Sequence, residues 1–268
     1  MPSTLALHNF FLIVRHFITK VDIFMQIKTF PVTLKESFMI TPKVKHFVFN
    51  CELSPHFSYE PGQFITIHFE HEGKALKRSY SIANAPKQDN QIEFAAGYFA
   101  NGPGTELLFN LKPGDTININ GPFGRLTMKE EQPGRYILIA TSTGITPYRA
   151  MLTELGKRME QNPDLHVVIL QGVQRREEIL YPNDFQAFAQ QYAHATFLPY
   201  LSRQPADDLL ESERTGYVQH AFPTLNLNPQ QDVIYLCGNP GMIDEAFNNL
   251  KEQGFAMQQI IREKYISR

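Results

Sequence analysis

The spacing of hydrophobic positions divides the chain into two parts. In the first part, short apolar runs rich in β-branched and aromatic residues stand between Pro and Gly turn signals such as Pro61-Gly62. Closely spaced runs of this kind are typical of the strands of a small antiparallel barrel. The predicted strands cover residues 45–49, 64–69, 91–99 and 116–120.

A polar linker ending at Pro133-Gly134 leads into the second part, where apolar strands alternate with amphipathic helices. This alternation implies a parallel sheet with helices on both faces. The predicted strands cover residues 136–140, 166–170, 196–201, 233–236 and 257–261, and the predicted helices cover residues 147–159, 184–192 and 242–253. The predicted fold class is a two-domain protein, with an antiparallel β-barrel over residues 25–128 followed by an α/β doubly wound parallel sheet over residues 135–268.

The first 24 residues fit neither part. Residues 5–18 are mostly apolar, but His8 and Arg15 interrupt the run, which is too short and too polar to span a bilayer. The segment also lacks the small-residue cleavage site of a signal peptide. We interpret residues 1–24 as an extension or as the result of a start codon placed too early, and the alternative is an interfacial anchor.

Composition narrows the class of protein. Of the 268 residues, 43% are hydrophobic and 19% are charged, a balance that favours a globular fold over disorder. A net charge of −2 provides no strong field for nucleic acid or an anionic membrane. The two cysteines, Cys51 and Cys237, form no C-x-x-C pair, which argues against a disulfide framework and against a metal or iron–sulfur centre on this chain. We expect a cytoplasmic protein without a membrane span.

The string Arg78-Ser79-Tyr80-Ser81 combines groups that suit a flat, phosphate-bearing ligand. A guanidinium holds phosphate, a tyrosine ring stacks on an aromatic ring, and a hydroxyl meets a ring heteroatom. The alternative is an ordinary strand with a surface arginine. The string resembles the flavin-binding R-x-Y-S signature of the ferredoxin–NADP⁺ reductase superfamily. That resemblance assigns the flavin phosphate to Arg78, packing on the isoalloxazine to Tyr80, and a place near flavin N5 to Ser81.

A second anion site is predicted at residues 102–105, where Gly104 and Thr105 precede an apolar turn. Free amides at a helix start, together with a hydroxyl cap, attract an anion. The family places the FAD pyrophosphate at such a loop, and the alternative is a plain capped helix.

Residues 141–147 lie between a predicted strand and a predicted helix, where amides and the helix dipole suit a pyrophosphate. The stretch resembles the family's G-T-G-I-A-P loop, which implies nucleotide contacts for Thr143, Gly144 and Pro147. Ser142 stands where glycine is common in the family, which weakens the expectation of close backbone approach.

Two further elements resemble those that hold the 2′-phosphate of NADP⁺ in plant-type reductases. The resemblance implies this role for Ser202, Arg203, Tyr217 and Gln219. Gly172-Val173 followed by Tyr181 resembles another nucleotide-contacting stretch. Arg175, Arg176 and Arg214 are additional candidates, and each is alternatively a solvated charge.

The C-terminal part supplies the last candidates. Residues 237–242 resemble the family's C-G-x-x-x-M loop, which implies a position beside the nicotinamide for Cys237; a buried structural cysteine is the alternative. Glu263 and Tyr265 match the family's E-x-Y end, which implies a glutamate at the nicotinamide and a ring that covers the flavin. The match departs because three residues, ending at Arg268, follow the tyrosine. Tyr265 stacking elsewhere and Arg268 meeting a phosphate therefore remain open.

Together the motifs imply FAD and NADP(H) as cofactors and Ser81, Cys237 and Glu263 as catalytic residues. The implied reaction is hydride transfer from NADPH to flavin N5, followed by release of single electrons to an acidic carrier, ferredoxin or flavodoxin. Candidates for a carrier-docking patch, or else for a generic solvated surface, are Lys43, Lys45, Lys74 and Lys77. The alternatives are an oxygenase reductase component, a free-flavin reductase, and a non-catalytic redox sensor or electron-transfer subunit.

Overall fold

The computed structural model describes residues 29–51, 57–87, 90–130 and 133–266. The interpretation of residues 1–24 and the expectation for Arg268 lie outside the described residues.

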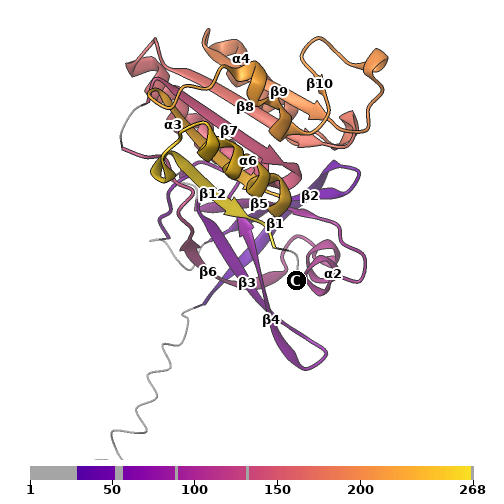
Figure 1. Cartoon of the computed structure of the whole chain (residues 1–268). Coiled ribbons are helices and arrows are strands. Elements are labelled where there is room, and N and C mark those ends of the chain that lie inside the picture. Colours follow the sequence, from indigo (N-terminus) through magenta and orange to yellow (C-terminus); the bar gives the residue numbers. More distant parts are fainter. Residues whose placement is uncertain (1–28, 52–56, 88–89, 131–132, 267–268) are drawn as a thin grey trace, which may run out of the picture.

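The first domain is a six-stranded antiparallel sheet that closes on itself (Figure 1). Its strands are β1 (Phe30–Thr41), β2 (Val44–Asn50), β3 (Phe64–His71), β4 (Lys74–Ser81), β5 (Gln91–Gly97) and β6 (Thr116–Phe123). The strand order is β4-β3-β6-β1-β2-β5, and a bridge between Ile82 and Phe94 joins the two outer strands. Stacked rings of Phe47, Phe49 and Phe94 fill the interior. The predicted antiparallel barrel is confirmed.

The second domain is a six-stranded sheet in which every neighbouring pair is parallel. Its strands, in the order β10-β9-β8-β7-β11-β12, are β7 (Arg135–Thr141), β8 (His166–Val173), β9 (Ala195–Leu201), β10 (Arg214–Thr215), β11 (Asp232–Gly238) and β12 (Ile260–Lys264). The helices are α2 (Pro103–Asn110) beside the barrel and α3 (Thr146–Gln161), α4 (Pro182–Gln191), α5 (Phe222–Leu225) and α6 (Pro240–Glu252) around the parallel sheet.

Helices cover both faces of the parallel sheet. Tyr148 of α3 and Phe185 of α4 belong to one buried cluster, whereas Ile243 of α6 belongs to another on the opposite face. Strand β7 is consequently apolar along most of its length, as expected of a strand buried on both faces. The predicted doubly wound parallel sheet is confirmed.

Two predicted strand boundaries are wrong. Residues 257–259 form a 3₁₀ turn rather than a strand, because the Gln259 side chain accepts a hydrogen bond from the Ala256 amide at 3.0 Å and closes the turn. Strand β12 therefore begins at Ile260 and extends to Lys264. Strand β5 ends at Gly97 because the Phe99 amide donates to the Thr105 hydroxyl instead of to a neighbouring strand.

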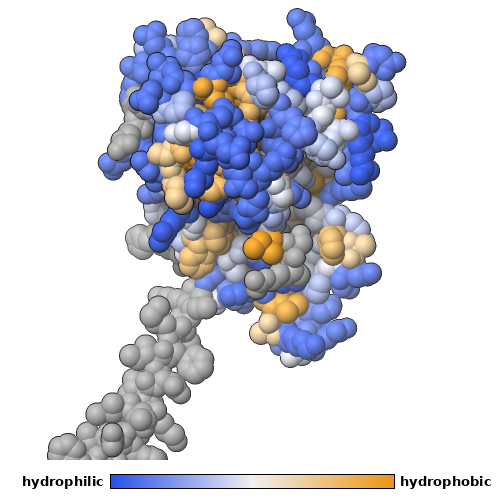
Figure 2. Space-filling view, in the orientation of Figure 1, coloured by the Kyte–Doolittle hydropathy of each residue, from blue (hydrophilic) through white to orange (hydrophobic). Residues whose placement is uncertain are grey.

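Within the described ranges, no helix is long and apolar enough to cross a membrane. The face drawn in Figure 2 is mainly hydrophilic over the α/β domain.

Candidate active site

A cavity of about 600 Å³ lies where the barrel meets the parallel sheet. We call it the barrel-side cavity. Arg78, Tyr80 and Ser81 of β4 line it, as do Glu263 and Tyr265 from the C-terminal segment. Residues more than 180 positions apart in the sequence thus meet in one cavity of a size typical for small-molecule sites, about 300–1,000 Å³.

The start of α2 packs directly against Arg78. A Cβ on Gly104 would lie 2.9 Å from Arg78 Cγ and 3.4 Å from the Tyr80 hydroxyl oxygen, so a side chain there would press on both. The Tyr80 ring stacks on Phe94 with centroids 4.9 Å apart, and burial raises the pKa of Tyr80 to about 12. Tyr80 is therefore a neutral, fixed ring beside the cavity.

The prediction of a hydroxyl cap at the start of α2 is wrong. The N-cap residue is Gly102, which has no side chain to cap with, and the Thr105 hydroxyl accepts from the Phe99 amide at 3.3 Å. Gly104 and Thr105 are buried beside the cavity rather than among its lining residues.

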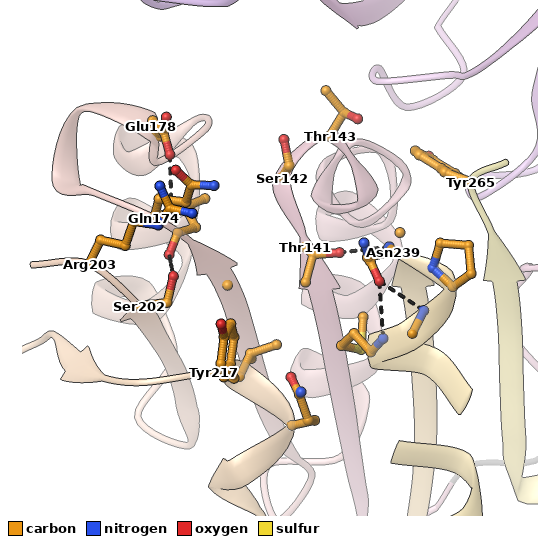
Figure 3. A pocket seen from close by; sticks show the side chains of 18 of the residues that line it. Thr141, Ser142, Thr143, Gln174, Glu178, Ser202, Arg203, Tyr217, Asn239 and Tyr265 are labelled. Atoms are coloured by element: carbon orange, nitrogen blue, oxygen red, sulfur yellow. Dashed lines mark hydrogen bonds between the residues drawn. The ribbon is translucent and has the colours of Figure 1, made fainter. Parts of the chain in front are cut away.

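A second cavity, of about 880 Å³, opens at the carboxyl ends of the parallel strands. We call it the sheet-side cavity. Figure 3 shows Ser202, Arg203 and Tyr217 on one side of it, with Thr141 and Thr143 on the other. This edge of a doubly wound sheet is where ligands generally bind.

The loop between β7 and α3 explains why glycine suits these positions. Ser142 adopts φ +47°, in the left-handed region that favours glycine, so the serine retains the backbone shape at a cost of about 1–2 kcal/mol. A Cβ on Gly144 would lie 2.4 Å from the Cys237 carbonyl oxygen, so the loop rests directly on the end of β11. Gly144 and Pro147 are buried and support the loop, whereas Thr143 lines both cavities.

The four candidates for the 2′-phosphate come together in the sheet-side cavity. Ser202, Arg203, Tyr217 and Gln219 all line it. Tyr217 is 61% exposed, and the Gln219 amide donates to Glu245 of α6 at 2.8 Å.

Two of the three additional arginine candidates, Arg176 and Arg214, bind groups of the protein itself. Arg176 forms a two-pronged ion pair with buried Glu213, at 2.7 Å from both Nε and Nη2. Arg214 donates to the carbonyl oxygens of Glu211 and Glu213. Arg176 and Arg214 are therefore structural, and they lie outside the residues that line the cavity, as does Arg175.

The two cavities share a wall made of Thr143, Tyr265 and Ile266. The Tyr265 amide donates to the Gly238 carbonyl oxygen at 2.8 Å, which ties the segment to the end of β11. The Tyr265 hydroxyl oxygen lies 2.5 Å from Ser81 Oγ. Since Ser81 donates its one proton to Glu263 at 3.4 Å, Tyr265 donates to Ser81.

Glu263 is a carboxyl group in a poorly solvated place. Burial raises the pKa of Glu263 to about 7, and the hydrogen bond from Ser81 opposes this shift only in part. Cys237 lies opposite Glu263 in the pairing of β11 with β12 and is fully buried. Burial raises the pKa of its thiol well above the ordinary value, so Cys237 is a neutral group behind the wall rather than part of a cavity lining.

A cluster of polar side chains joins the domains beside the cavities. We call His46, Glu93, Arg149, Tyr181 and Asp184 the interdomain polar cluster. Tyr181 was expected at the nucleotide, but it is buried, and its hydroxyl pairs with His46 Nδ1 at 2.9 Å. Arg149 contacts Glu93 at 2.7 Å and Asp184 at 2.5 Å. Local sequence does not mark this cluster, because its members come from four separate elements.

Sequence reasoning also missed the barrel's contribution to the sheet-side cavity. The hairpin between β1 and β2 reaches over it, and Thr41, Lys43 and Val44 line it. Lys43 Nζ lies 3.9 Å from Glu178, and Lys45 donates to the Phe109 carbonyl oxygen at 3.5 Å. The carrier-docking role expected of Lys43, Lys45, Lys74 and Lys77 stays a prediction.

The match to family models agrees with this geometry. Residues 31–128 match the oxidoreductase FAD-binding domain and residues 138–247 match the oxidoreductase NAD-binding domain. The chain belongs to the ferredoxin–NADP reductase family, whose members are oxidoreductases with these FAD-binding and NAD-binding domains.

Individual relatives differ in the partners that their names imply. A ferredoxin–NADP reductase B from Sorangium cellulosum is 32% identical over 186 residues, covering 69% of this chain and 74% of the relative. A ferredoxin–NADP reductase from Azotobacter vinelandii is 29% identical, covering 79% and 85%. A terephthalate 1,2-dioxygenase reductase component from Comamonas is 26% identical, covering 75% and 57%. The fold is that of a ferredoxin NADP⁺ reductase from Neisseria gonorrhoeae, with a TM-score of 0.77 at 22% identity, covering 88% and 98%.

Proposed function

We propose that the protein oxidises NADPH and passes the electrons singly to a small carrier protein, a ferredoxin or a flavodoxin. The observation that carries the proposal is the shared wall. One cavity holds an arginine and a tyrosine from the barrel, the other holds the candidates for a 2′-phosphate, and Thr143, Tyr265 and Ile266 separate them.

The residues of the barrel-side cavity fit FAD. Arg78 would hold a flavin phosphate, because a guanidinium binds phosphate with charge-assisted hydrogen bonds. Gly104 leaves room for α2 to approach Arg78 and Tyr80, where any side chain would intrude. The chemistry that FAD supplies when bound is acceptance of a hydride and release of electrons one at a time.

The residues of the sheet-side cavity fit NADPH. The amides before α3, near Thr143, would meet the pyrophosphate at the positive end of the helix dipole. Ser202, Arg203 and Tyr217 would bind the 2′-phosphate, which NADH lacks. NADPH is therefore the favoured donor.

Residues at the shared wall would control access and protonation. The Tyr265 ring stands between the cavities, so it must move aside before a nicotinamide approaches the flavin. Ser81 and Glu263 would then lie at the point of hydride transfer, with Ser81 able to donate a proton to a ring nitrogen and Glu263 able to hold or release one near neutral pH.

Turnover assays with defined acceptors test this function. We expect purified protein to oxidise NADPH rapidly with ferricyanide and with ferredoxins or flavodoxins from the same host, but slowly with free FMN. Rapid turnover with free FMN would instead identify a free-flavin reductase. Turnover that requires an oxygenase from the host would identify an oxygenase reductase component, which the Comamonas relative makes the second candidate. Absence of NADPH oxidation with every acceptor would favour the non-catalytic alternative.

A further inference from the structure

Arg149 is the one member of the interdomain polar cluster that contacts both domains through three separate groups. Its Nε donates to Asp184 of α4 at 2.5 Å. Its Nη1 donates to Glu93 of β5 at 2.7 Å and to the Ala83 carbonyl oxygen at 3.1 Å. A guanidinium offers five donors in a rigid plane, which allows this simultaneous contact, whereas a lysine ammonium is a single point.

Arg149 and its two partners in the barrel, Ala83 and Glu93, are close in sequence to a cavity wall. Arg149 follows Thr146, which lines the barrel-side cavity, by three positions, within the first turn of α3. Ala83 follows Ser81 by two positions, and Glu93 precedes Ala95 of the cavity wall by two. The Ala83 amide also donates to the Glu93 carbonyl oxygen at 2.7 Å, so the barrel side of the contact is one tied unit.

His46 makes a second connection across the same junction. Its Nε2 lies 3.3 Å from Glu93, and its Nδ1 lies 2.9 Å from the Tyr181 hydroxyl oxygen. The Arg149 guanidinium lies 4.8 Å from the centre of the Tyr181 ring. The cluster is thus a closed ring of contacts, and its members fix one another's positions.

We propose that Arg149 is a positioning residue for hydride transfer, which sets the distance between the barrel-side and sheet-side cavities by its simultaneous contacts with Glu93, Ala83 and Asp184. The proposal rests on the proposed function. Reacting atoms must approach to about 3–3.5 Å, and a displacement of about 1 Å far from the chemistry lowers a rate by roughly a hundredfold. Val44 and Ala95 of the barrel also belong to the apolar cluster of the parallel-sheet domain, so loss of Arg149 should loosen the alignment of the domains rather than separate them.

Stopped-flow reduction of the bound flavin by saturating NADPH tests the proposal, because this single turnover needs correct alignment of both domains. We expect Arg149→Lys to lower the rate constant between about tenfold and a hundredfold. FAD retention, the dissociation constant of NADP⁺, and the rate of flavin reduction by dithionite should change less than about twofold, because Arg78 and Tyr80 lie in the barrel whereas Ser202, Arg203 and Tyr217 lie in the parallel-sheet domain, away from Arg149. Glu93→Gln should lower the same rate constant by a smaller factor, since the amide keeps one contact with Arg149.

Arg135→Lys is the matched control. Arg135 forms a two-pronged ion pair with buried Asp232 inside the parallel-sheet domain, at 2.9 Å and 2.6 Å. A similar loss of thermal stability is expected in both variants, but Arg135→Lys should leave the single-turnover rate constant unchanged.

Three outcomes would overturn the inference. These are an unchanged rate constant in Arg149→Lys, an equal decrease in Arg135→Lys, and a decrease accompanied by equal loss of FAD or NADP⁺ binding. If wild-type flavin is reduced by NADH rather than NADPH, the donor preference in the proposed function is wrong, and the same comparison made with NADH decides the role of Arg149. If neither nucleotide reduces wild-type flavin, both proposals are wrong.

Discussion

Two carboxylates at the junction of the domains have opposite properties. Glu93 contacts Arg149 and His46, and although burial alone would raise its pKa, these hydrogen bonds lower it to about 2. Glu263 receives its hydrogen bond from the neutral Ser81 hydroxyl, so burial prevails and raises its pKa to about 7. The first carboxylate is fixed in the charged form, whereas the second can change its charge at neutral pH.

The difference separates groups that hold the domains together from groups available to a ligand. In the interdomain polar cluster each charge meets an opposite charge of the protein itself. Arginines show the same contrast: Arg176 is paired with Glu213, whereas Arg203 lines the sheet-side cavity, and among the described residues its guanidinium has no ion pair. A charged side chain that lines a cavity without an ion pair inside the protein is expected at a ligand-binding site.

The largest expected effect is on flavin binding. Arg78→Ala should weaken FAD binding roughly 10- to 150-fold, because a charge-assisted contact with phosphate contributes about 1.5–3 kcal/mol. Lys74→Ala, at an exposed position of β4 outside the cavity lining, is the control and should bind FAD normally. FAD titration of the stripped protein measures both. Equal affinities in the two variants would remove Arg78 from the ligand-facing group.

The second-largest expected effect is on the preference for NADPH over NADH. Arg203→Ala should lower kcat/KM for NADPH about tenfold or more and leave kcat/KM for NADH nearly unchanged, because NADH carries no 2′-phosphate. Arg176→Ala, which breaks a pair inside the protein, should lower stability without altering the ratio of the two efficiencies. Steady-state kinetics with both nucleotides decides the matter, and an equal loss for both in Arg203→Ala would contradict the assignment.

Glu263→Gln should change the way in which stability and the single-turnover rate depend on pH. This effect should be smaller than the two changes in ligand binding described above. The raised pKa means that the folded protein binds a proton that the unfolded chain releases, so stability decreases as the pH rises from about 4.5 to about 7. The glutamine variant should lack this decrease and also lack a step near pH 7 in the single-turnover rate. Urea unfolding and stopped-flow measurements across this range test both parts. A step that persists in the variant would assign the titration to another group.

The smallest expected effect is the contribution of Glu93 to stability at acidic pH. Its lowered pKa contributes stability that is fully present above about pH 4.5 and is lost as the pH falls toward about 2, opposite in sign to Glu263. The stability difference between wild type and Glu93→Gln should therefore be constant from about pH 5 to 8 and shrink in more acidic buffer. Urea midpoints at closely spaced pH values measure it, and a difference that grows on acidification would contradict the pairing with Arg149.

Local sequence patterns predicted some features of the fold and of the site but not others. Strand β7 could be predicted because residues 136–140 form an uninterrupted apolar run. Of the residues named for the flavin, Arg78, Tyr80, Ser81 and Tyr265 line one cavity, whereas Gly104 and Thr105 lie beside it. The role of Arg149 could not be predicted, because its partners Glu93 and Asp184 lie 56 and 35 positions away and nothing local distinguishes it from other helix arginines. Tyr181 was misplaced for the same reason, since its partner His46 lies 135 positions away.

The sequence by itself determined the order of strands and helices, and with it the side chains that follow the carboxyl ends of the parallel strands. Those features depend on periodicity over a few residues, which any short window of the chain contains. Only the tertiary structure decided that Tyr265 divides two cavities and that Glu263 titrates near neutral pH. Both depend on distances between groups far apart in the chain, such as Ser81 and Glu263, which are 182 positions apart, and on the burial that folding imposes on them.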